Sequence, residues 1–276
     1  GHALNFRLRK METDIKETLF LLYLAEECNR PNDMLAFARD LISRKTELDD
    51  DESPKVCEAF NRNLVRIRDN RRAYMKLLAQ YRGNLPADIA PEVMKGEERI
   101  LLKLMKSHKQ SSSLLNEIRL LFREIKSLEC EIRTLCHEFI AAIELKMLRS
   151  DCDSASKVFL HKVKADCYCI LCEVSFGEEH ENYGQRCLLE YKGASDIALT
   201  SLHPCHPVRL SLALNFAAFY TEELDMKKRG GLLLRSAIED AVLSSKHEMS
   251  AAYKEQAGEL LLKMKKNIEL WGIMGK

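Results

Sequence analysis

The chain contains 276 residues, of which 46% are apolar and 31% are charged, and its formal net charge at pH 7 is +1. This composition is typical of a folded domain and excludes a disordered chain, while the near-zero charge gives no overall attraction to nucleic acid or to an anionic membrane. No stretch approaches the roughly 18 consecutive apolar residues of a membrane-spanning helix, and the charges among positions 7–16 exclude the apolar core of a signal peptide.

The long segments of the chain repeat their apolar residues with the period of an α-helix, and strand-like alternation occurs nowhere at useful length. Eleven glycines and six prolines mark the few breaks. The sequence therefore predicts an all-α fold, an antiparallel array of helices joined by short loops. In chain order, the helices are expected over residues 11–28, 33–44, 54–82, 97–106, about 114–139, 156–175, 182–200, 207–224, 231–245 and 250–271.

The third of these helices has a clear start signal. An acidic run, residues 49–52, leads into Ser53 and Pro54. Serine at the N-cap with proline at the first helical position is a common helix start, and carboxylates there suit the positive end of the helix dipole. A break with one glycine and two prolines follows residue 82.

The strongest pattern of the sequence lies in its middle. Apolar residues there alternate spacings of four and three, which is typical of a helix that packs along a second helix. This seam consists of Leu114, Ile118, Leu121, Ile125, Leu128, Ile132, Leu135 and Phe139.

Ten cysteines are scattered without the rhythm of a disulfide scaffold, which indicates reduced thiols in the cytoplasm or the nucleus. The densest group, Cys167, Cys169 and Cys172, is a candidate metal site. Cys167 and Cys169 lie about 200° apart around a helix, however, and structural zinc pairs place two residues between cysteines on a tight turn. We therefore interpret these cysteines as buried small apolar residues and expect neither a metal nor a cofactor.

The sequence carries no signature of catalysis. A glycine-rich phosphate loop, HExxH and GxSxG are all missing, and no repeat of 34 or 40 residues indicates a helical solenoid. His203 and His206 flank Cys205 in a loop. A catalytic or metal site is one interpretation of this loop, and a structural polar loop is the favoured one. We expect a protein that is not an enzyme.

The third helix is strongly basic. Asn61, Arg68 and Arg72 fall at spacings of seven and four residues and so share one flank, where two guanidiniums can bind a phosphate dianion. The alternative is a solvated basic face, which the spacing alone favours. Nucleic-acid binding is disfavoured because no aromatic residues are interleaved for base stacking. The cationic residues of this helix are Lys55, Arg62, Arg66, Arg68, Arg71, Arg72, Lys76 and Arg82.

Two stretches resemble a known family. Residues 157–166, followed by Glu173, resemble the fifth helix of the 14-3-3 proteins, and residues 206–220 resemble their seventh helix specifically. The resemblance covers essentially the whole chain, 1–276, as a single domain with about thirty extra residues at 82–112. Further matching positions are Leu24-Ala25-Glu26, Asp33-Met34, Tyr253-Lys254, Asn267 and Leu270-Trp271.

The resemblance implies a cup of about nine helices, usually a homodimer in the cytoplasm, whose amphipathic groove binds extended segments carrying phosphoserine or phosphothreonine. A register shifted by one turn on the third helix would replace Arg68 by Lys76, and Arg72 belongs to both registers. The resemblance assigns phosphate binding to Arg68, Arg72 and Lys162, hydrogen bonds to the ligand backbone to Asn215 and Asn267, the apolar groove wall to Leu214, Ala218, Leu270 and Trp271, and groove carboxylates to Asp166 and Glu222.

The chain also departs from the family pattern. Asn61 stands where the family has a groove lysine, and Cys169 and Ile170 stand where it has a phosphate-binding arginine and a tyrosine. Ala218 replaces a larger valine, and Lys263 occupies a position that is normally leucine. We therefore expect an adaptor with a weakened phosphate clamp. The alternative is a helical scaffold that binds unphosphorylated or acidic partner segments through other surfaces.

The residues at the family's dimer interface are changed too. In the family, the first helix of one subunit packs against the third and fourth helices of its partner. Arg30 and Glu131 are expected to retain one ion pair, whereas Glu124 and Ser127 replace the residues that would pair with Asp33. We expect a homodimer that is weaker than usual. The expected interface residues are Leu24, Cys28, Arg30, Asp33 and Glu131.

Overall fold

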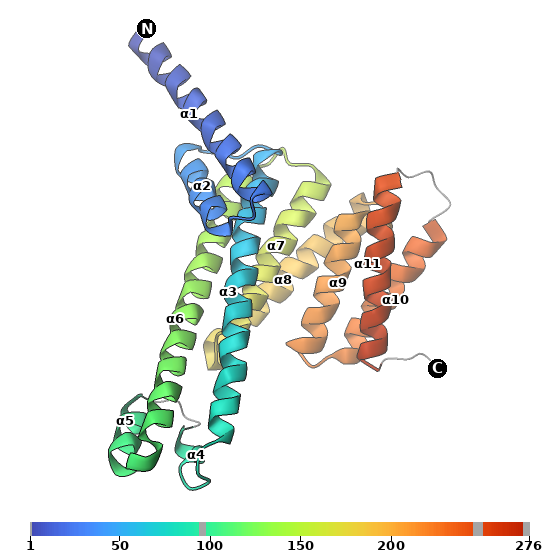
Figure 1. Cartoon of the computed structure of the whole chain (residues 1–276). Helices are drawn as coiled ribbons and strands as arrows, with labels where there is room; N and C mark the ends of the chain where they lie inside the picture. Colours follow the sequence, from blue (N-terminus) through green and yellow to red (C-terminus); the bar gives the residue numbers. More distant parts are fainter. Residues whose placement is uncertain (1, 94–97, 245–250, 273–276) are drawn as a thin grey trace.

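The computed structural model of the chain describes residues 2–93, 98–244 and 251–272, and these residues contain helices and no strand. The predicted all-α fold is confirmed (Figure 1). None of the described helices is long and apolar enough to cross a lipid bilayer. The long helices are α1 (His2–Glu27), α2 (Pro31–Arg44), α3 (Glu52–Gly83), α6 (Ser112–Ala142), α7 (Ser154–Glu173), α8 (Gly177–Ser201), α9 (Pro207–Glu222), α10 (Lys227–Ser244) and α11 (Ala251–Leu270).

Helices α3 and α6 form the longest pair of the fold and run side by side in opposite directions (Figure 1). The predicted seam on α6 makes this contact: Ile118, Ile132 and Phe139 are buried, and Leu128 is partly buried. Phe139 stacks on Phe60 of α3 with ring centroids 4.5 Å apart. The alternation of four and three residues therefore located a real helix–helix contact.

The described residues of the segment 82–112, namely 82–93 and 98–112, form a small lobe at the free end of this pair (Figure 1). It contains α4 (Ala90–Val93), α5 (Glu98–Ser107) and a 3₁₀ turn, η1 (Lys109–Ser111). Val93 and Leu101 are buried against Leu78 of α3 and Leu115 of α6, in a cluster separate from the main core. The lobe thus closes the end of the α3–α6 pair with an apolar core of its own.

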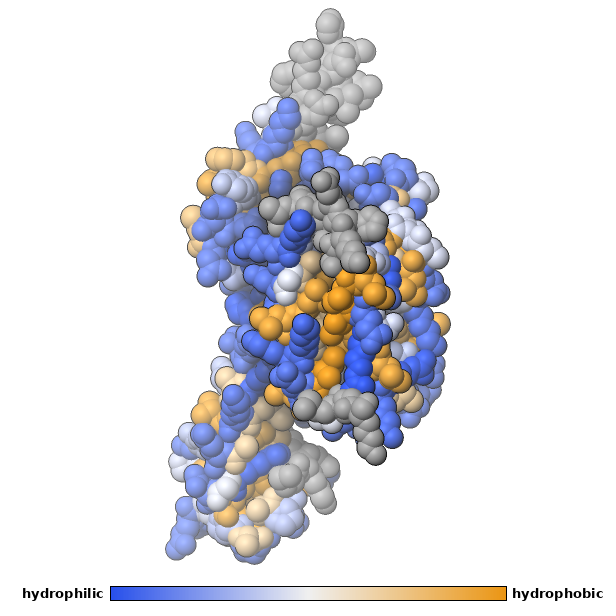
Figure 2. All heavy atoms as spheres, turned by 90° about the vertical axis from the view of Figure 1, so that its right-hand side faces the viewer, coloured by the Kyte–Doolittle hydropathy of each residue, from blue (hydrophilic) through white to orange (hydrophobic). Residues whose placement is uncertain are grey.

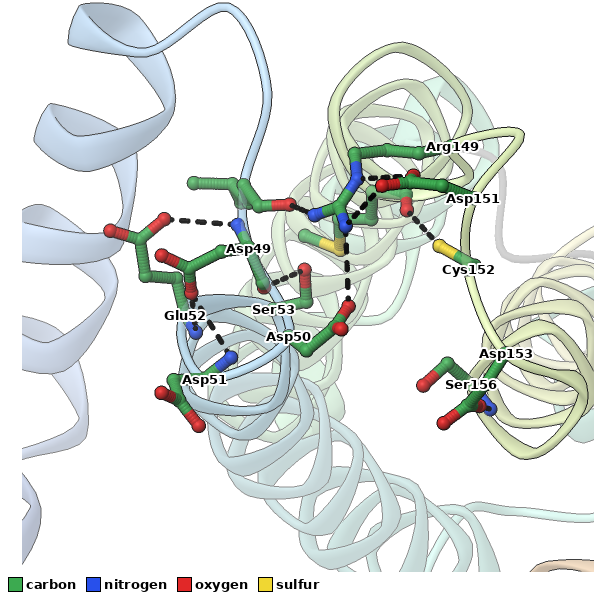
Figure 3. Close-up of polar contacts among 12 residues, drawn as sticks. Asp49, Asp50, Asp51, Glu52, Ser53, Arg149, Asp151, Cys152, Asp153 and Ser156 are labelled. Carbon is green, nitrogen blue, oxygen red and sulfur yellow. Dashed lines mark hydrogen bonds and ion pairs between the residues drawn. The ribbon is translucent and has the colours of Figure 1, made fainter.

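The start of α3 differs from the expectation by two residues. The helix begins at Glu52 with Asp51 as its N-cap residue, and the Asp49 side chain rather than that of Ser53 accepts the first backbone amides. Its Oδ1 accepts the backbone N–H groups of Asp51 (3.0 Å) and Glu52 (2.9 Å), while Ser53 donates its hydroxyl to the Asp49 carbonyl (2.9 Å; Figure 3). One carboxylate satisfies both amides and brings a charge that suits the helix dipole, so the predicted Ser53 N-cap is wrong.

Arg149 ties this acidic loop to the segment that precedes α7 (Figure 3). It follows a π-helical turn, η2 (Ile143–Met147), at the end of α6. Its guanidinium donates to the carbonyl of Leu48 (2.6 Å) and to Asp151 (2.9 Å), and pairs with Asp50 at 3.6 Å. These contacts hold the first turn of α3 beside the chain that leads into α7.

The C-terminal half packs α9, α10 and α11 around a third apolar cluster. Gly230 permits the close approach of α10 to α9, because a Cβ there would lie 2.4 Å from Thr221 Oγ1 and 2.7 Å from the Ala217 carbonyl oxygen. Hydrophobic side chains gather in a band on the side of the molecule where α10 and α11 lie (Figure 2). Helices α3, α7, α9 and α11 thereby line two neighbouring pockets.

Candidate functional site

Two pockets lie along α7 and α9 and are together called the groove. The first, of about 300 Å³, is lined by side chains of α3, α7, α8 and α9. The second, of about 320 Å³, is lined by side chains of α7, α9 and α11, including Lys162 and Lys263. The first pocket collects five of the predicted site residues, of which Ala218 is also a departure from the family pattern, and three further departures: Arg68, Asp166, Asn215, Ala218, Glu222, Asn61, Cys169 and Ile170.

Arg68 is the cation that lines the first pocket, and it already has a partner. Its Nε donates to Glu173 Oε2 at 3.1 Å, and a second guanidinium nitrogen contacts the other oxygen of the same carboxylate. Both side chains are largely shielded, at 22% and 27% exposure. This forked pair fixes the guanidinium of α3 against the end of α7.

Arg72 lies one turn further along α3 and lines neither pocket. Its guanidinium is 58% exposed and pairs with Asp69 at 3.3 Å, within the same helix. Lys76 is also exposed and lines neither pocket. Of the alternatives for the third helix, the structure brings Arg68 to the pocket wall.

Asp166 links the two pockets. Its Oδ2 accepts a hydrogen bond from Lys162 Nζ (2.7 Å), and its Oδ1 accepts from Tyr191 Oη (2.6 Å) and Asn215 Nδ2 (3.0 Å). The charge of Lys162 is therefore neutralised, and the amide of Asn215 is turned toward α7. Burial, then the charge of Asp166, raise the pKa of Tyr191 well above its ordinary value, so the phenol stays protonated and donates.

Sequence reasoning missed Tyr191 and the pairing of Arg68 with Glu173. Tyr191 lies in the middle of α8, where a buried tyrosine has no distinctive spacing. Glu173 stands out in the sequence only as part of the family-like stretch. Which helix its carboxylate faces depends on packing, and no local pattern reports that.

Cys169 and Ile170 both line the first pocket, so the positions that hold an arginine and a tyrosine in the family face the site. Cys167, in contrast, is buried in the main core. The thiols of Cys167 and Cys169 thus point in different directions, as expected from the helical period.

Besides Arg72, four predicted groove residues line neither pocket. Leu214 and Trp271 pack, half-buried, against the C-terminal cluster. Leu270 is 81% exposed, and Asn267 is half-buried on α11. The structure therefore brings Arg68 and Asp166 into one pocket with Asn215, Ala218 and Glu222 of α9. The predicted α11 residues are not part of the lining of that pocket.

The loop that precedes α9 has a structural role. His206 is the N-cap of α9, where its Nδ1 accepts the backbone N–H of Val208 at 3.2 Å, and His203 Nδ1 accepts that of Cys205 at 3.2 Å. Cys205 is buried and donates its thiol to the Ala241 carbonyl at 3.2 Å. The two histidines are thus used by the turn itself, and Cys205 ties the turn to α10, as the favoured interpretation of a structural loop expected.

Comparisons with known proteins agree with this geometry. A model of the 14-3-3 protein family matches residues 21–272. The chain belongs to the 14-3-3 family. It is 28% identical to the checkpoint signal transducer rad24 of Schizosaccharomyces pombe over 259 residues, which are 94% of this chain and 85% of that protein. It is 27% identical to 14-3-3 protein epsilon of Drosophila melanogaster over 259 residues (94% and 88%), and 29% identical to 14-3-3 protein 10 of Solanum lycopersicum over 256 residues (93% and 91%).

Membership of the 14-3-3 family implies a phosphopeptide-binding adaptor role, and 14-3-3 proteins are adaptors rather than enzymes. The expectation of a divergent family member that is not an enzyme is therefore confirmed.

The residues expected at a 14-3-3 dimer interface lie on the surface of this chain. Leu24 is 40% exposed and Cys28 is exposed. Arg30 pairs with Asp33 three residues along α2, and Glu131 lies 3.9 Å from Arg66. The members of the expected intersubunit pair thus have partners within their own chain. Large apolar side chains exposed beside Leu24 on α1 are Phe20, Leu21 and Tyr23.

Proposed function

We propose that this 14-3-3 protein binds extended client segments carrying phosphoserine or phosphothreonine in its groove, through a phosphate clamp weaker than that of its relatives. The observation that carries this proposal is the lining of the first pocket. Arg68 and Asn215 face it beside the apolar Ala218, and so do Cys169 and Ile170, which replace half of the clamp.

The weaker phosphate affinity follows from the side chains that remain in the clamp. A phosphoserine dianion presents three strong acceptor oxygens, and each charge-assisted hydrogen bond contributes about 1.5–3 kcal/mol. The side chains of Cys169 and Ile170 supply no strong donor. Loss of an arginine and a tyrosine corresponds to about a tenfold to thousandfold weaker affinity than an intact clamp would have.

Binding also requires an exchange of partners at Arg68. The guanidinium must turn at least part of its fork from Glu173 to the phosphate. A phosphate dianion carries nearly twice the charge of the carboxylate and more acceptor sites, so the exchange favours a phosphorylated segment over an unphosphorylated one. Arg72, which is exposed and weakly paired, adds attraction from one turn away.

The client backbone would be bound by Asn215. Its amide now donates to Asp166, which also accepts hydrogen bonds from Lys162 and Tyr191. Asp166 therefore keeps two donors when Asn215 turns to a ligand. The exchange replaces one hydrogen bond by another and costs little in net free energy.

The alternative function is a scaffold that binds unphosphorylated or acidic segments through other surfaces. Two observations favour it: Arg68, Arg72 and Lys162 each have a carboxylate partner within the chain, and the lobe at 82–112 adds a surface with a core of its own. Under either function we propose a homodimer that works in the cytoplasm, where its ten free thiols would stay reduced.

A degenerate phosphoserine and phosphothreonine peptide array, printed beside its unphosphorylated copies, tests the proposal. For the best binder, fluorescence anisotropy should show tighter binding of the phosphorylated form, reduced by added salt because the cations are partly exposed. Arg68→Ala should weaken the phosphorylated form about 10- to 100-fold and leave the unphosphorylated form nearly unchanged.

Arg123→Ala is the matched control, since Arg123 is an exposed arginine on α6 outside the groove, paired with its neighbour Glu124. Equal binding of phosphorylated and unphosphorylated peptides, unaffected by Arg68→Ala, would reject the phosphate site and favour the scaffold.

A further inference from the structure

A second cluster of chemically active side chains lies where three helices meet. Cys172 is the penultimate residue of α7, His180 lies in the first turn of α8, and Glu223 follows the last residue of α9. A ligand atom from each, namely the Sγ, a ring nitrogen and a carboxylate oxygen, lies within 4.8 Å of the other two. We propose that Cys172, His180 and Glu223 bind a zinc ion.

Cys172 and His180 are already oriented toward each other. His180 Nδ1 lies 3.1 Å from the backbone carbonyl oxygen of Cys172, and since a carbonyl only accepts, Nδ1 carries the proton. Nε2 then keeps its lone pair for a metal. A ring N–H donated to a backbone carbonyl is the usual arrangement for a metal-bound histidine, because it fixes the tautomer.

The turn between α7 and α8 makes this orientation possible. Gly177 starts α8 at φ +59°, a left-handed conformation that favours glycine and folds the chain tightly back on itself. The thiol of Cys172 lies 3.7 Å from the carbonyl oxygen of His180, so the two residues contact each other through both backbone and side chain. Little chain entropy remains to be lost when an ion binds.

The charges around the cluster favour a cation. Glu173 follows Cys172 directly and Glu222 precedes Glu223 directly, so both bring further carboxylates to the ends of α7 and α9 beside the cluster. Arg68, which opposes these charges, is already paired with Glu173. A divalent cation at the cluster would offset the like-charge repulsion among these carboxylates.

The chemical types of the three ligands favour zinc over other metal ions. A thiolate, an imidazole and a carboxylate form a mixed sulfur, nitrogen and oxygen set that suits zinc, whereas magnesium and calcium prefer oxygen ligands alone. Atoms bound to one zinc ion at about 2.0–2.3 Å lie roughly 3.3–3.8 Å apart at tetrahedral angles. The three ligand atoms must therefore approach one another by about 1.5 Å at most.

The exposure of the three ligand side chains determines how a zinc ion can reach the site. Cys172 is buried, while His180 and Glu223 are half-exposed, so an ion can reach the site from solvent and water can fill its fourth position. A bound ion would join the turn between α7 and α8 to the end of α9, next to the Arg68–Glu173 pair of the groove. We expect zinc to stabilise the folded chain, because the unfolded chain lacks a preformed site.

The test uses the full chain, reduced and stripped of metal with a chelator. After equilibration with zinc chloride and gel filtration, elemental analysis should find about one zinc per chain, and competition with a chromogenic chelator gives the affinity. Cobalt chloride in place of zinc should give a thiolate-to-metal charge-transfer band. Cys172→Ser, His180→Gln and Glu223→Gln should each weaken zinc binding at least about tenfold.

Two controls separate this site from adventitious binding. Cys130→Ser removes an exposed thiol and His137→Gln an exposed imidazole, both on α6 outside the cluster, and neither should change zinc binding. Circular dichroism checks that each variant folds, and zinc should raise the melting temperature of the parent but not of the three ligand variants. Less than half a zinc per chain, or binding that all three ligand substitutions leave intact, would overturn the proposal.

Discussion

Each cation of the proposed phosphate site has an acidic partner, and the ion pairs differ in how much free energy is needed to break them when a ligand binds. The Arg68–Glu173 pair is forked and shielded, whereas the Arg72–Asp69 pair is single and exposed. Exposed pairs contribute little, so Arg72 is released from Asp69 almost freely, while Arg68 must exchange one charge-assisted partner for another. The phosphate affinity of this chain therefore depends on Arg68 most and on Arg72 to a smaller extent.

Restoring the missing half of the clamp tests the proposed cause of its weakness. Cys169 and Ile170 face the same pocket as Arg68. The double substitution Cys169→Arg with Ile170→Tyr should therefore tighten binding of a phosphorylated array peptide about 10- to 1,000-fold, because it adds new donors to the phosphate.

The unphosphorylated peptide should gain little from the same double substitution. Phosphopeptide anisotropy on parent and variant measures both effects. If the restored pair leaves phosphopeptide affinity unchanged and neither Arg68→Ala nor Arg72→Ala has an effect, the groove is not a phosphate site and the scaffold alternative is preferred.

At the scale of single helices, the start of α7 depends on one carboxylate. Asp153 is its N-cap and accepts the backbone N–H of Ser156 at 2.6 Å (Figure 3). That hydrogen bond holds the pKa of the Asp153 carboxyl below its ordinary value. A lowered folded-state pKa means that the stabilisation is complete above the unfolded pKa of about 4, and is lost as the pH falls through the folded pKa.

Asp153→Ala should accordingly lower the free energy of unfolding by about 1 kcal/mol at pH 7, and the deficit should shrink as the pH falls below about 4. Asp153→Asn, which keeps an acceptor without the charge, should retain most of the stability and lose the pH dependence. Urea titrations across this pH range measure both effects. If the Asp153→Ala variant is as stable as the parent at pH 7, the cap is dispensable.

The contact between α3 and α6 allows a matched pair of core substitutions. Ile132 is fully buried, whereas Leu128, one turn earlier on the same seam, is only partly buried. Ile132→Ala should cost about 2–5 kcal/mol of unfolding free energy, and Leu128→Ala about half as much, because less of its surface leaves water on folding. Equal costs, measured by urea denaturation, would mean that the burial of the seam is uniform.

At the scale of the whole molecule, the proposed homodimer depends on exposed apolar side chains of α1. Arg30 and Asp33 pair with each other, and Glu131 lies near Arg66, so charges contribute little between subunits. Phe20, Leu21, Tyr23 and Leu24 must then supply the association energy.

Light scattering after gel filtration, repeated over a dilution series, should show a homodimer at micromolar concentration that dissociates at lower concentration. Leu24→Glu should shift the chain to monomer, whereas Leu189→Glu, which changes an exposed leucine of α8, should not. A dimer that persists at nanomolar concentration contradicts the weakened interface, and a monomer at every concentration contradicts the dimer itself.

The sequence by itself determined the all-α fold, the seam on α6 and the family. Helical periodicity is a local property, and the motif at 206–220 is specific, so both can be found without knowing which helix meets which. The family resemblance also assigns Arg68, Asp166 and Asn215 to one groove, and all three line the first pocket.

Only the tertiary structure decided how these residues are used. The pairing of Arg68 with Glu173, the hydrogen bond from Tyr191 to Asp166, and the meeting of Cys172, His180 and Glu223 each join residues of different helices. Periodicity reports which face of a helix is apolar, but the contact between two helix ends depends on loop conformation and on packing of the whole core. For the same physical reason, the Ser53 cap was placed two residues late: a loop carboxylate that folds back can replace a hydroxyl at the expected position.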